Sequence, residues 1–158
     1  AVAAVACTGG AAAATATDAQ RTHMYASDLE VECGGTVHSF EVDGDILDFG
    51  HCHCSICRRL HGAAYATFAG VERSRFRYLA GETDVRIYSS SPGNDRVFCA
   101  HCGSPILVDP KTEPARLYLS MSAVEGDPPL PAGYHAWVSA KAPWHEITDE
   151  LPQFNEWS

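Results

Sequence analysis

The sequence is poor in basic residues and contains no long apolar run. It has 11 Lys and Arg against 20 Asp and Glu, which gives a formal net charge of −9. Proteins that bind a nucleic-acid backbone need clustered Lys and Arg, so this balance argues against nucleic acid as the main partner. No stretch approaches about 18 consecutive apolar residues, and we predict no membrane span. The 9 prolines are spread along the chain and disfavour long helices.

The first residues differ in composition from the rest of the chain. Residues 1–17, which begin with Ala1, are rich in alanine and carry no charge. One interpretation is the trimmed end of a precursor whose targeting segment, such as a mitochondrial transit peptide, was removed. The other is a flexible extension. We therefore treat residues 1–28 as an N-terminal extension and residues 29–158 as one folded domain.

Short segments of β-forming residues follow this extension. Gly, Pro, Asn and Asp separate them, and the pattern predicts a mainly β, antiparallel fold. One short helix is predicted at Ser55–His61. The predicted strands are Leu29–Cys33, Thr36–Val42, Ala64–Ala69, Phe76–Leu79, Val85–Ser89, Arg96–Phe98, Ile106–Val108, Arg116–Ser120 and Tyr134–Val138.

Three of the 7 cysteines lie close together, as the Cys-x-Cys-x-x-Cys pattern of Cys52, Cys54 and Cys57. We call them the cysteine triplet. A disulfide between the first two would close a strained ring, whereas metal binding has no such difficulty. Zinc favours tetrahedral thiolate ligands, and three protein ligands leave its fourth position open to water or substrate. The triplet therefore predicts an open, reactive zinc site, with an iron–sulfur cluster or a redox thiol group as alternatives.

A second cysteine pattern, Cys-x-x-Cys-Gly, is formed by Cys99, Cys102 and Gly103 and is typical of a zinc knuckle. Gly103 can take a left-handed conformation, so that backbone N–H groups point at the two thiolates. These two cysteines need ligand partners from elsewhere, and Cys33 is the obvious candidate. The remaining Cys7 is interpreted as a small buried apolar residue.

Histidines and arginines surround the triplet. His51 and His53 alternate with its first two cysteines, so on an extended segment they face the other way and are poor metal ligands. Arg58 and Arg59 directly follow the triplet. They are interpreted either as a solvated basic turn or as the group that holds a substrate carboxylate beside the negatively charged thiolates.

Three separated motifs resemble those of one family. They are Cys52–Arg59, Phe98–Pro105 and the tail from Trp137 to Phe154. Through them the chain resembles, from about Val31 onward, the glutathione-dependent formaldehyde-activating enzyme family, also called the centromere protein V family. The resemblance implies a β-rich fold of the Mss4-like type. It also implies a structural zinc on cysteines of the family's first and last cysteine motifs and a second zinc on the cysteine triplet.

The resemblance further implies a reaction. Enzymes of this family are assigned the addition of glutathione to formaldehyde, which gives S-hydroxymethylglutathione and is formally a carbon–sulfur lyase activity. The triplet zinc would then hold the glutathione sulfur as a thiolate that attacks formaldehyde. Arg58 or Arg59 would anchor a glutathione carboxylate. We expect one or two zinc ions per chain.

The sequence departs from the family at one place. The family's first motif is Cys-x-Cys-Gly, and Cys33 is the one cysteine present there. Cys33, Cys99 and Cys102 then supply three ligands where a structural zinc needs four. We predict an impaired or empty structural site. Rescue by Cys7 is the alternative, because His38 is predicted to lie on the opposite face of its strand.

This missing ligand keeps a second function open. The protein would then be a zinc-stabilised binding or accessory subunit, without chemistry of its own, of a larger complex, for which an organelle is one location. Glutathione binding discriminates the two, because an enzyme must bind it and an accessory subunit need not. Thiols at metal-like spacing favour a reducing compartment, the cytoplasm or an organelle matrix. The sequence leaves homo-oligomers and protein partners open.

Overall fold

Short β-strands make up most of the chain that the structure describes. The computed structural model describes residues 24–33, 36–124 and 127–157, with side chains from His38 onward. The α-helix is α1 (Ser55–His61), and four single 3-10 turns are η1 (Arg73–Arg75), η2 (Glu82–Asp84), η3 (Met121–Ala123) and η4 (Val138–Ala140). The strands are β1 (Met24–Cys33), β2 (Thr36–Asp43), β3 (Asp48–Cys52), β4 (Ala66–Glu72), β5 (Phe76–Ala80), β6 (Val85–Ser91), β7 (Asn94–Cys99), β8 (Pro105–Pro110), β9 (Arg116–Ser120) and β10 (Tyr134–Ala136).

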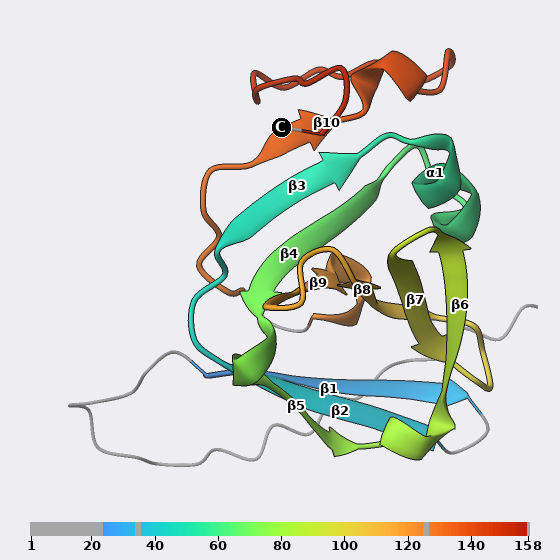
Figure 1. The fold of residues 1–158 in the computed structure, drawn as a ribbon, viewed down its shortest axis with the longest axis vertical. Coiled ribbons are helices and arrows are strands. Elements are labelled where there is room, and N and C mark those ends of the chain that lie inside the picture. Colours follow the sequence, from blue (N-terminus) through green and yellow to red (C-terminus); the bar gives the residue numbers. More distant parts are fainter. Residues whose placement is uncertain (1–23, 34–35, 125–126, 158) are drawn as a thin grey trace, which may run out of the picture.

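The strands form two sheets. One has three strands in the order β1-β2-β5, and the other has seven in the order β10-β3-β4-β9-β8-β7-β6. Figure 1 shows the small sheet at the bottom and β10 at the top, with the larger sheet curving between them. The mainly β prediction is confirmed. One pair, β10 with β3, is parallel, so the larger sheet is mixed rather than purely antiparallel.

The main hydrophobic core joins the two sheets. Phe40 and Val42 of β2 belong to one buried cluster with Val71 of β4 and Leu119 of β9. Successive residues of a strand point to opposite faces, so Tyr118 of β9 faces away from this core. It belongs to a second buried cluster on the other face of the larger sheet, made of Cys52, Cys57, Ala66, Phe68, Val108 and Tyr118. The fold therefore places the cysteine triplet on the face away from the main core.

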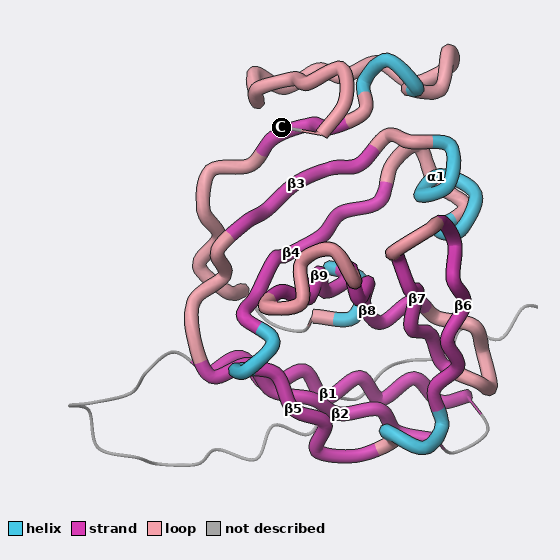
Figure 2. The backbone as a smooth tube through the Cα atoms, viewed as in Figure 1, coloured by secondary structure: helices cyan, strands magenta, loops and turns pink. Residues whose placement is uncertain are grey.

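The observed elements can be compared with the predicted ones. α1 covers the same residues as the predicted helix, and each strand predicted between Ala64 and Ser120 overlaps an observed strand. β1 begins earlier than predicted, at Met24, and β10 ends earlier than predicted, at Ala136. β3 was not predicted. Much of the chain after β10 runs without strands, as Figure 2 shows.

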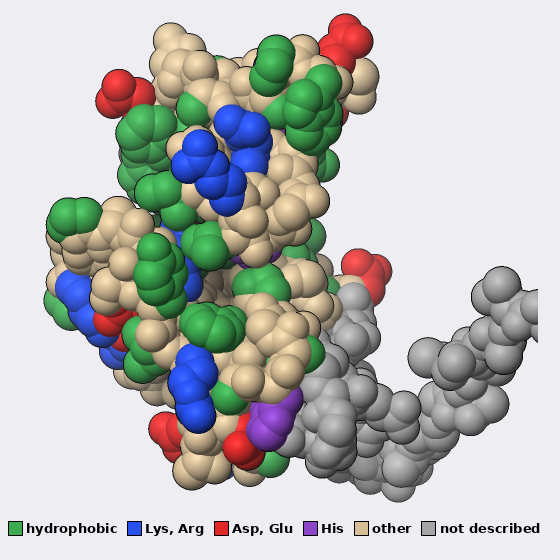
Figure 3. Space-filling view, turned by 90° about the vertical axis from the view of Figure 1, so that its right-hand side faces the viewer, with side chains coloured by type: hydrophobic (Ala, Val, Ile, Leu, Met, Phe, Trp, Pro, Cys, Tyr) green, Lys and Arg blue, Asp and Glu red, His purple; other side chains and the backbone are tan. Residues whose placement is uncertain are grey.

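Two surface properties bear on partners. Within the described ranges, no helix is long and apolar enough to cross a bilayer. On the face drawn in Figure 3, the Lys and Arg side chains form small separate groups between hydrophobic and neutral side chains. That face offers no continuous basic surface.

Candidate metal and thiol site

The cysteine triplet lies where β3 ends and α1 begins. Cys52 is the last residue of β3, Cys54 is the N-cap of α1, and Cys57 lies in the first turn of the helix. The helix starts here because the backbone of Cys54 is extended and its Sγ accepts a hydrogen bond from the Cys57 N–H at 3.3 Å. This junction turns all three thiols toward one point, and their sulfur atoms lie within 4.8 Å of one another.

Hydrogen bonds distribute the charge within the triplet. The pKa of Cys54 lies well below its usual range, because the Cys52 and Cys57 thiols and then the backbone N–H groups of the first turn donate to its sulfur. The pKa of Cys52 is raised, first by its hydrogen bond to Cys54, then by the one to Cys57 and by burial. Negative charge is therefore concentrated on Cys54. A cation bound there would displace the protons of the neighbouring thiols.

The donor set fits zinc. A tetrahedral ion with Zn–S bonds of about 2.3 Å separates its sulfur ligands by about 3.8 Å. The three sulfurs lie within 4.8 Å of one another, a spacing compatible with shared binding of one such ion. Cys52 and Cys57 are buried and Cys54 is half-buried. The triplet could thus hold a zinc ion by three ligands and leave one coordination position open.

A cavity of about 550 Å³ opens over the triplet. We call it the triplet cavity. All three cysteines line it, together with Phe68 of β4, Arg96 of β7 and residues that follow β10. Its walls therefore come from segments that lie far apart in the sequence. Its size suits a small-molecule ligand.

Arg96 supplies the positive charge of this cavity. Among the described residues that line it, Arg96 is the only Lys or Arg. Its Nη2 lies 3.7 Å from Cys57 Sγ, its Nε donates to Ser90 Oγ at 3.0 Å, and its Cζ lies 5.8 Å from the centroid of the Phe68 ring. A fixed guanidinium at this place stabilises anionic sulfur. Arg96 was not among the site residues predicted from the sequence. Its place three residues before Cys99, a predicted metal ligand, was the one local sign of it.

The two arginines that the sequence singled out lie elsewhere. Arg58 donates through Nε to the carbonyl oxygen of His53 at 3.3 Å, and Arg59 is exposed. Neither is among the described residues that line the triplet cavity. Both lie in the last turn of α1, where a positive charge favours the helix dipole. Arg58 therefore stabilises the β3–α1 junction through its hydrogen bond to the His53 carbonyl oxygen.

Histidines pack behind the junction, and the prediction that His51 and His53 face away from the triplet is confirmed. His51 Nδ1 lies 2.9 Å from Thr67 Oγ1, and His53 Nε2 lies 2.8 Å from His135 Nδ1. His135 Nε2 lies 3.1 Å from both carboxylate oxygens of Asp149. Burial, followed by the charge of His135, lowers the pKa of His53 to about 4. This network runs from the buried His53 and His135 to the exposed Asp149 and holds the junction in place, and no local signal in the sequence pointed to His135 or Asp149.

The segment after β10 forms another wall of the cavity. Trp137 has φ 59° and ψ 37°, a left-handed backbone that costs a residue other than glycine about 1–2 kcal/mol. Its N–H donates to the carbonyl oxygen of Glu156 at 3.2 Å, and the Val138 N–H donates to that of Phe154 at 3.0 Å. These two hydrogen bonds stabilise the left-handed backbone of Trp137. The indole then packs against the buried cluster that contains the triplet.

The second cysteine pattern has the backbone expected of a knuckle. Gly103 has φ 76°, and its N–H donates to the carbonyl oxygen of Cys99 at 3.0 Å. The His101 N–H donates to Cys99 Sγ at 3.4 Å, and the Ser104 N–H donates to Cys102 Sγ at 3.5 Å. Both sulfurs thus receive backbone N–H groups, as expected of a zinc knuckle.

The other candidate ligands for the site of Cys99 and Cys102 are Cys33, Cys7 and His38. Cys33 ends β1, but its side chain, like the whole of Cys7, lies outside the described residues. His38 is fully buried, with Nδ1 3.1 Å from the carbonyl oxygen of Gly81. Among the described side chains, His38 does not join Cys99 and Cys102 in a metal-binding group. A structural zinc bound by Cys33, Cys99 and Cys102 therefore stays a prediction, as does its impairment.

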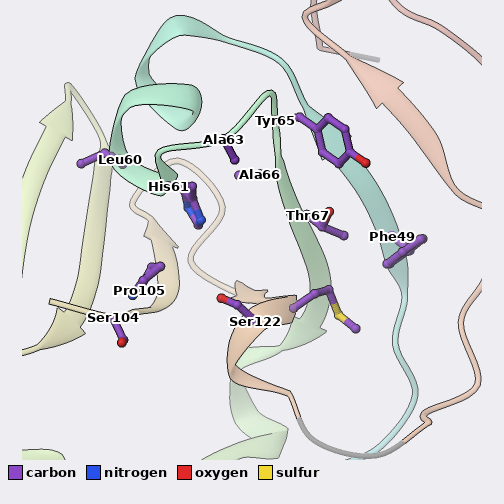
Figure 4. Close-up of a pocket in the computed structure, with 11 residues that line it drawn as sticks. Phe49, Leu60, His61, Ala63, Tyr65, Ala66, Thr67, Ser104, Pro105 and Ser122 are labelled. Carbon is purple, nitrogen blue, oxygen red and sulfur yellow. The ribbon is translucent and has the colours of Figure 1, made fainter. Parts of the chain in front are cut away.

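A separate cavity of about 560 Å³ lies on the other face of β3 and β4. Figure 4 shows His61 pointing into it from the end of α1, with Phe49 and Thr67 on its far side. None of the described residues that line this cavity is a cysteine, an acid, a Lys or an Arg. It therefore lacks the thiols and charges that distinguish the triplet cavity.

Comparison with known proteins agrees with the motifs. Residues 28–140 match the family described as glutathione-dependent formaldehyde-activating enzyme. A protein of Halomonas elongata, which carries that name provisionally, is 31% identical over 128 residues, covering 75% of this chain and 80% of that protein. A crystal structure of a Rhodobacter sphaeroides protein has the same fold, with a TM-score of 0.51 and 23% identity over 68% of this chain and 92% of that one. The chain therefore belongs to the glutathione-dependent formaldehyde-activating enzyme family.

Proposed function

We propose that the protein binds glutathione in the triplet cavity and adds it to formaldehyde to give S-hydroxymethylglutathione. The observation that best supports this is the set of three converging thiols beneath a cavity of about 550 Å³. A zinc ion held by Cys52, Cys54 and Cys57 would act as a Lewis acid that keeps the incoming thiol deprotonated at neutral pH. Formally this is a carbon–sulfur lyase activity.

The protein's own residues position and stabilise the reactants. The glutathione sulfur forms a C–S bond with the formaldehyde carbon, the carbonyl π-electron pair moves to oxygen, and that oxygen takes a proton from solvent. Arg96, 3.7 Å from Cys57 Sγ, would favour the anionic thiol before the attack. Phe68 and Trp137 would exclude water from one side of the sulfur, which strengthens the electrostatic attraction.

A binding and turnover experiment tests this function. We expect the zinc-loaded full chain to bind glutathione saturably in a calorimetric titration. We also expect it to form S-hydroxymethylglutathione faster than the uncatalysed reaction, as followed by NMR exchange spectroscopy. Glutathione binding without acceleration would favour the accessory-subunit alternative, which the absence of one family cysteine supports. Absence of binding would contradict the proposed function.

The arginine that anchors the ligand can be identified by a matched pair of variants. Arg96→Met keeps the length of the side chain and removes the charge from the triplet cavity, so we expect glutathione affinity to fall about ten-fold or more. Arg59→Met removes the same charge from an exposed position outside the cavity and should bind as the wild type does. The reverse result would assign the anchor to Arg59, one of the two arginines for which the family resemblance suggested that role. Calorimetric titration of both variants decides between them.

A further inference from the structure

One corner of the triplet cavity is acidic and aromatic. Among the described residues that line the cavity, Glu113 is the only acid. The Tyr118 hydroxyl donates to Glu113 Oε2 at 3.0 Å. The Trp157 ring packs edge-to-face on Tyr118, with ring centroids 6.2 Å apart, and it also lines the cavity. A carboxylate and two aromatic side chains thus share one wall.

The Glu113 carboxylate has no cationic partner within the described part of the chain. No Lys, Arg or His nitrogen there lies within 4.0 Å of it. Two other carboxylates differ, because Asp109 pairs with Arg73 and Lys111, and Glu41 pairs with Arg77. Asp48 resembles Glu113, since it accepts from the Tyr134 hydroxyl at 3.1 Å. Glu113 is itself half-buried, and the Tyr118 hydroxyl is its side-chain hydrogen-bond partner. The Arg116 side chain also reaches that hydroxyl, but it forms no ion pair with Glu113.

The backbone holds this carboxylate at the cavity wall. The Glu113 N–H donates to the carbonyl oxygen of Pro110 at 3.2 Å, and the Arg116 N–H donates to that of Glu113 at 2.9 Å. These bonds form a tight turn between β8 and β9. The Trp157 side of the corner is also held, since Glu156 accepts from the Trp137 N–H. The corner is therefore built by two ordered segments and does not depend on one flexible side chain.

An alkylammonium group is the ligand chemistry that this corner fits. It is attracted to a carboxylate and to the faces of Tyr and Trp rings, and these attractions strengthen where water is partly excluded. An anionic group would be repelled by Glu113, and an apolar group would leave its charge without a partner. The Trp157 ring is 47% exposed, so its surface is available to a ligand.

We propose that Glu113, Tyr118 and Trp157 form a subsite for the primary ammonium group of the thiol ligand. This inference rests on the proposed binding of a thiol at the cysteine triplet. The protein would then select thiols that carry a free α-amino group, with the sulfur at the triplet and the ammonium at this corner. Glutathione has one such group, and N-acetylglutathione lacks it while keeping the thiol and both carboxylates.

Calorimetric titration of the zinc-loaded full chain with these two thiols tests the subsite. The wild type is expected to bind glutathione at least about five-fold more tightly than N-acetylglutathione. Glu113→Gln keeps an acceptor for the Tyr118 hydroxyl and removes the charge, so it should bind both thiols equally. Trp157→Leu keeps an apolar wall and should reduce the preference. Glu150→Gln removes the same charge from an exposed site outside the cavity and should behave as the wild type.

The outcomes separate the subsite from the function on which it rests. Equal binding of the two thiols by the wild type, or a preference that survives Glu113→Gln in a protein of native circular dichroism, would overturn the subsite and leave thiol binding intact. Failure of the wild type to bind either thiol would overturn both. Loss of the preference in Glu150→Gln as well would show a general charge effect and overturn the assignment to Glu113.

Discussion

Replacement of Cys54 by Ser is expected to remove one equivalent of zinc per chain and to reduce glutathione-dependent activity to the uncatalysed level, while the fold is retained. Cys54 contributes one of the three converging sulfurs, and a serine hydroxyl is a poor zinc ligand. The helix should survive, because serine is among the best N-cap residues and its Oγ can accept the Cys57 N–H that Cys54 Sγ now accepts. Elemental analysis, circular dichroism and the NMR assay measure the three effects.

Two other variants serve as comparisons for Cys54→Ser. Ser55→Ala, within the Cys52–Cys57 segment, should keep zinc because its side chain supplies no sulfur. Cys99→Ser should instead lower the melting temperature, because Cys99 is buried and accepts the His101 N–H at the knuckle.

The wild type purified without chelator is expected to carry one or two zinc ions per chain. Iron in place of zinc would contradict the zinc prediction. Unfolding of Cys54→Ser as severe as that of Cys99→Ser would contradict the division into a reactive and a structural site.

Phe40→Ala is expected to lower the free energy of unfolding by about 3–5 kcal/mol. Phe40 of β2 is 2% exposed, and its ring centroid lies 5.3 Å from that of Phe76 on β5. It belongs to the core that joins the two sheets, so its removal leaves a cavity where neither sheet can easily close. We expect the melting temperature to fall by about 10 °C or more, as measured by differential scanning calorimetry.

Leu79→Ala is the matched control for this loss. Leu79 lies on β5 of the same small sheet, but it is 48% exposed. Its truncation should change stability by about 0.5 kcal/mol or less. If the two variants were destabilised equally, the contact between the sheets would not be the main core.

Local signals explain what could be predicted from the sequence. The short helix predicted at Ser55–His61 is α1, and Gly62 ends it in a left-handed conformation with φ 58°. The positions of the triplet and the knuckle also followed from spacing. β3 was missed because Gly50 interrupts its pattern. That glycine is required by a distant residue, since a Cβ there would lie 2.7 Å from Tyr134 Cζ.

The remainder depends on contacts between segments that are distant in sequence. Arg96 reaches Cys57 because β7 lies in the same sheet as β3 and β4, a pairing that no local pattern specifies. From the sequence, the positive charge beside the triplet was therefore predicted on the neighbouring Arg58 and Arg59. In the same way, His135 meets His53 because β10 pairs in parallel with β3.

This parallel pairing determines the order in which the site can form during synthesis. β3 has β4 on one side and β10 on the other, and β10 is translated after every other strand. The triplet lies within a few consecutive residues, so a nascent chain could bind a metal ion there before β10 is translated. The cavity walls that contain Trp137 and Trp157 follow only after β10 has docked on β3. The proposed metal binding would therefore become possible earlier in synthesis than the proposed ligand binding.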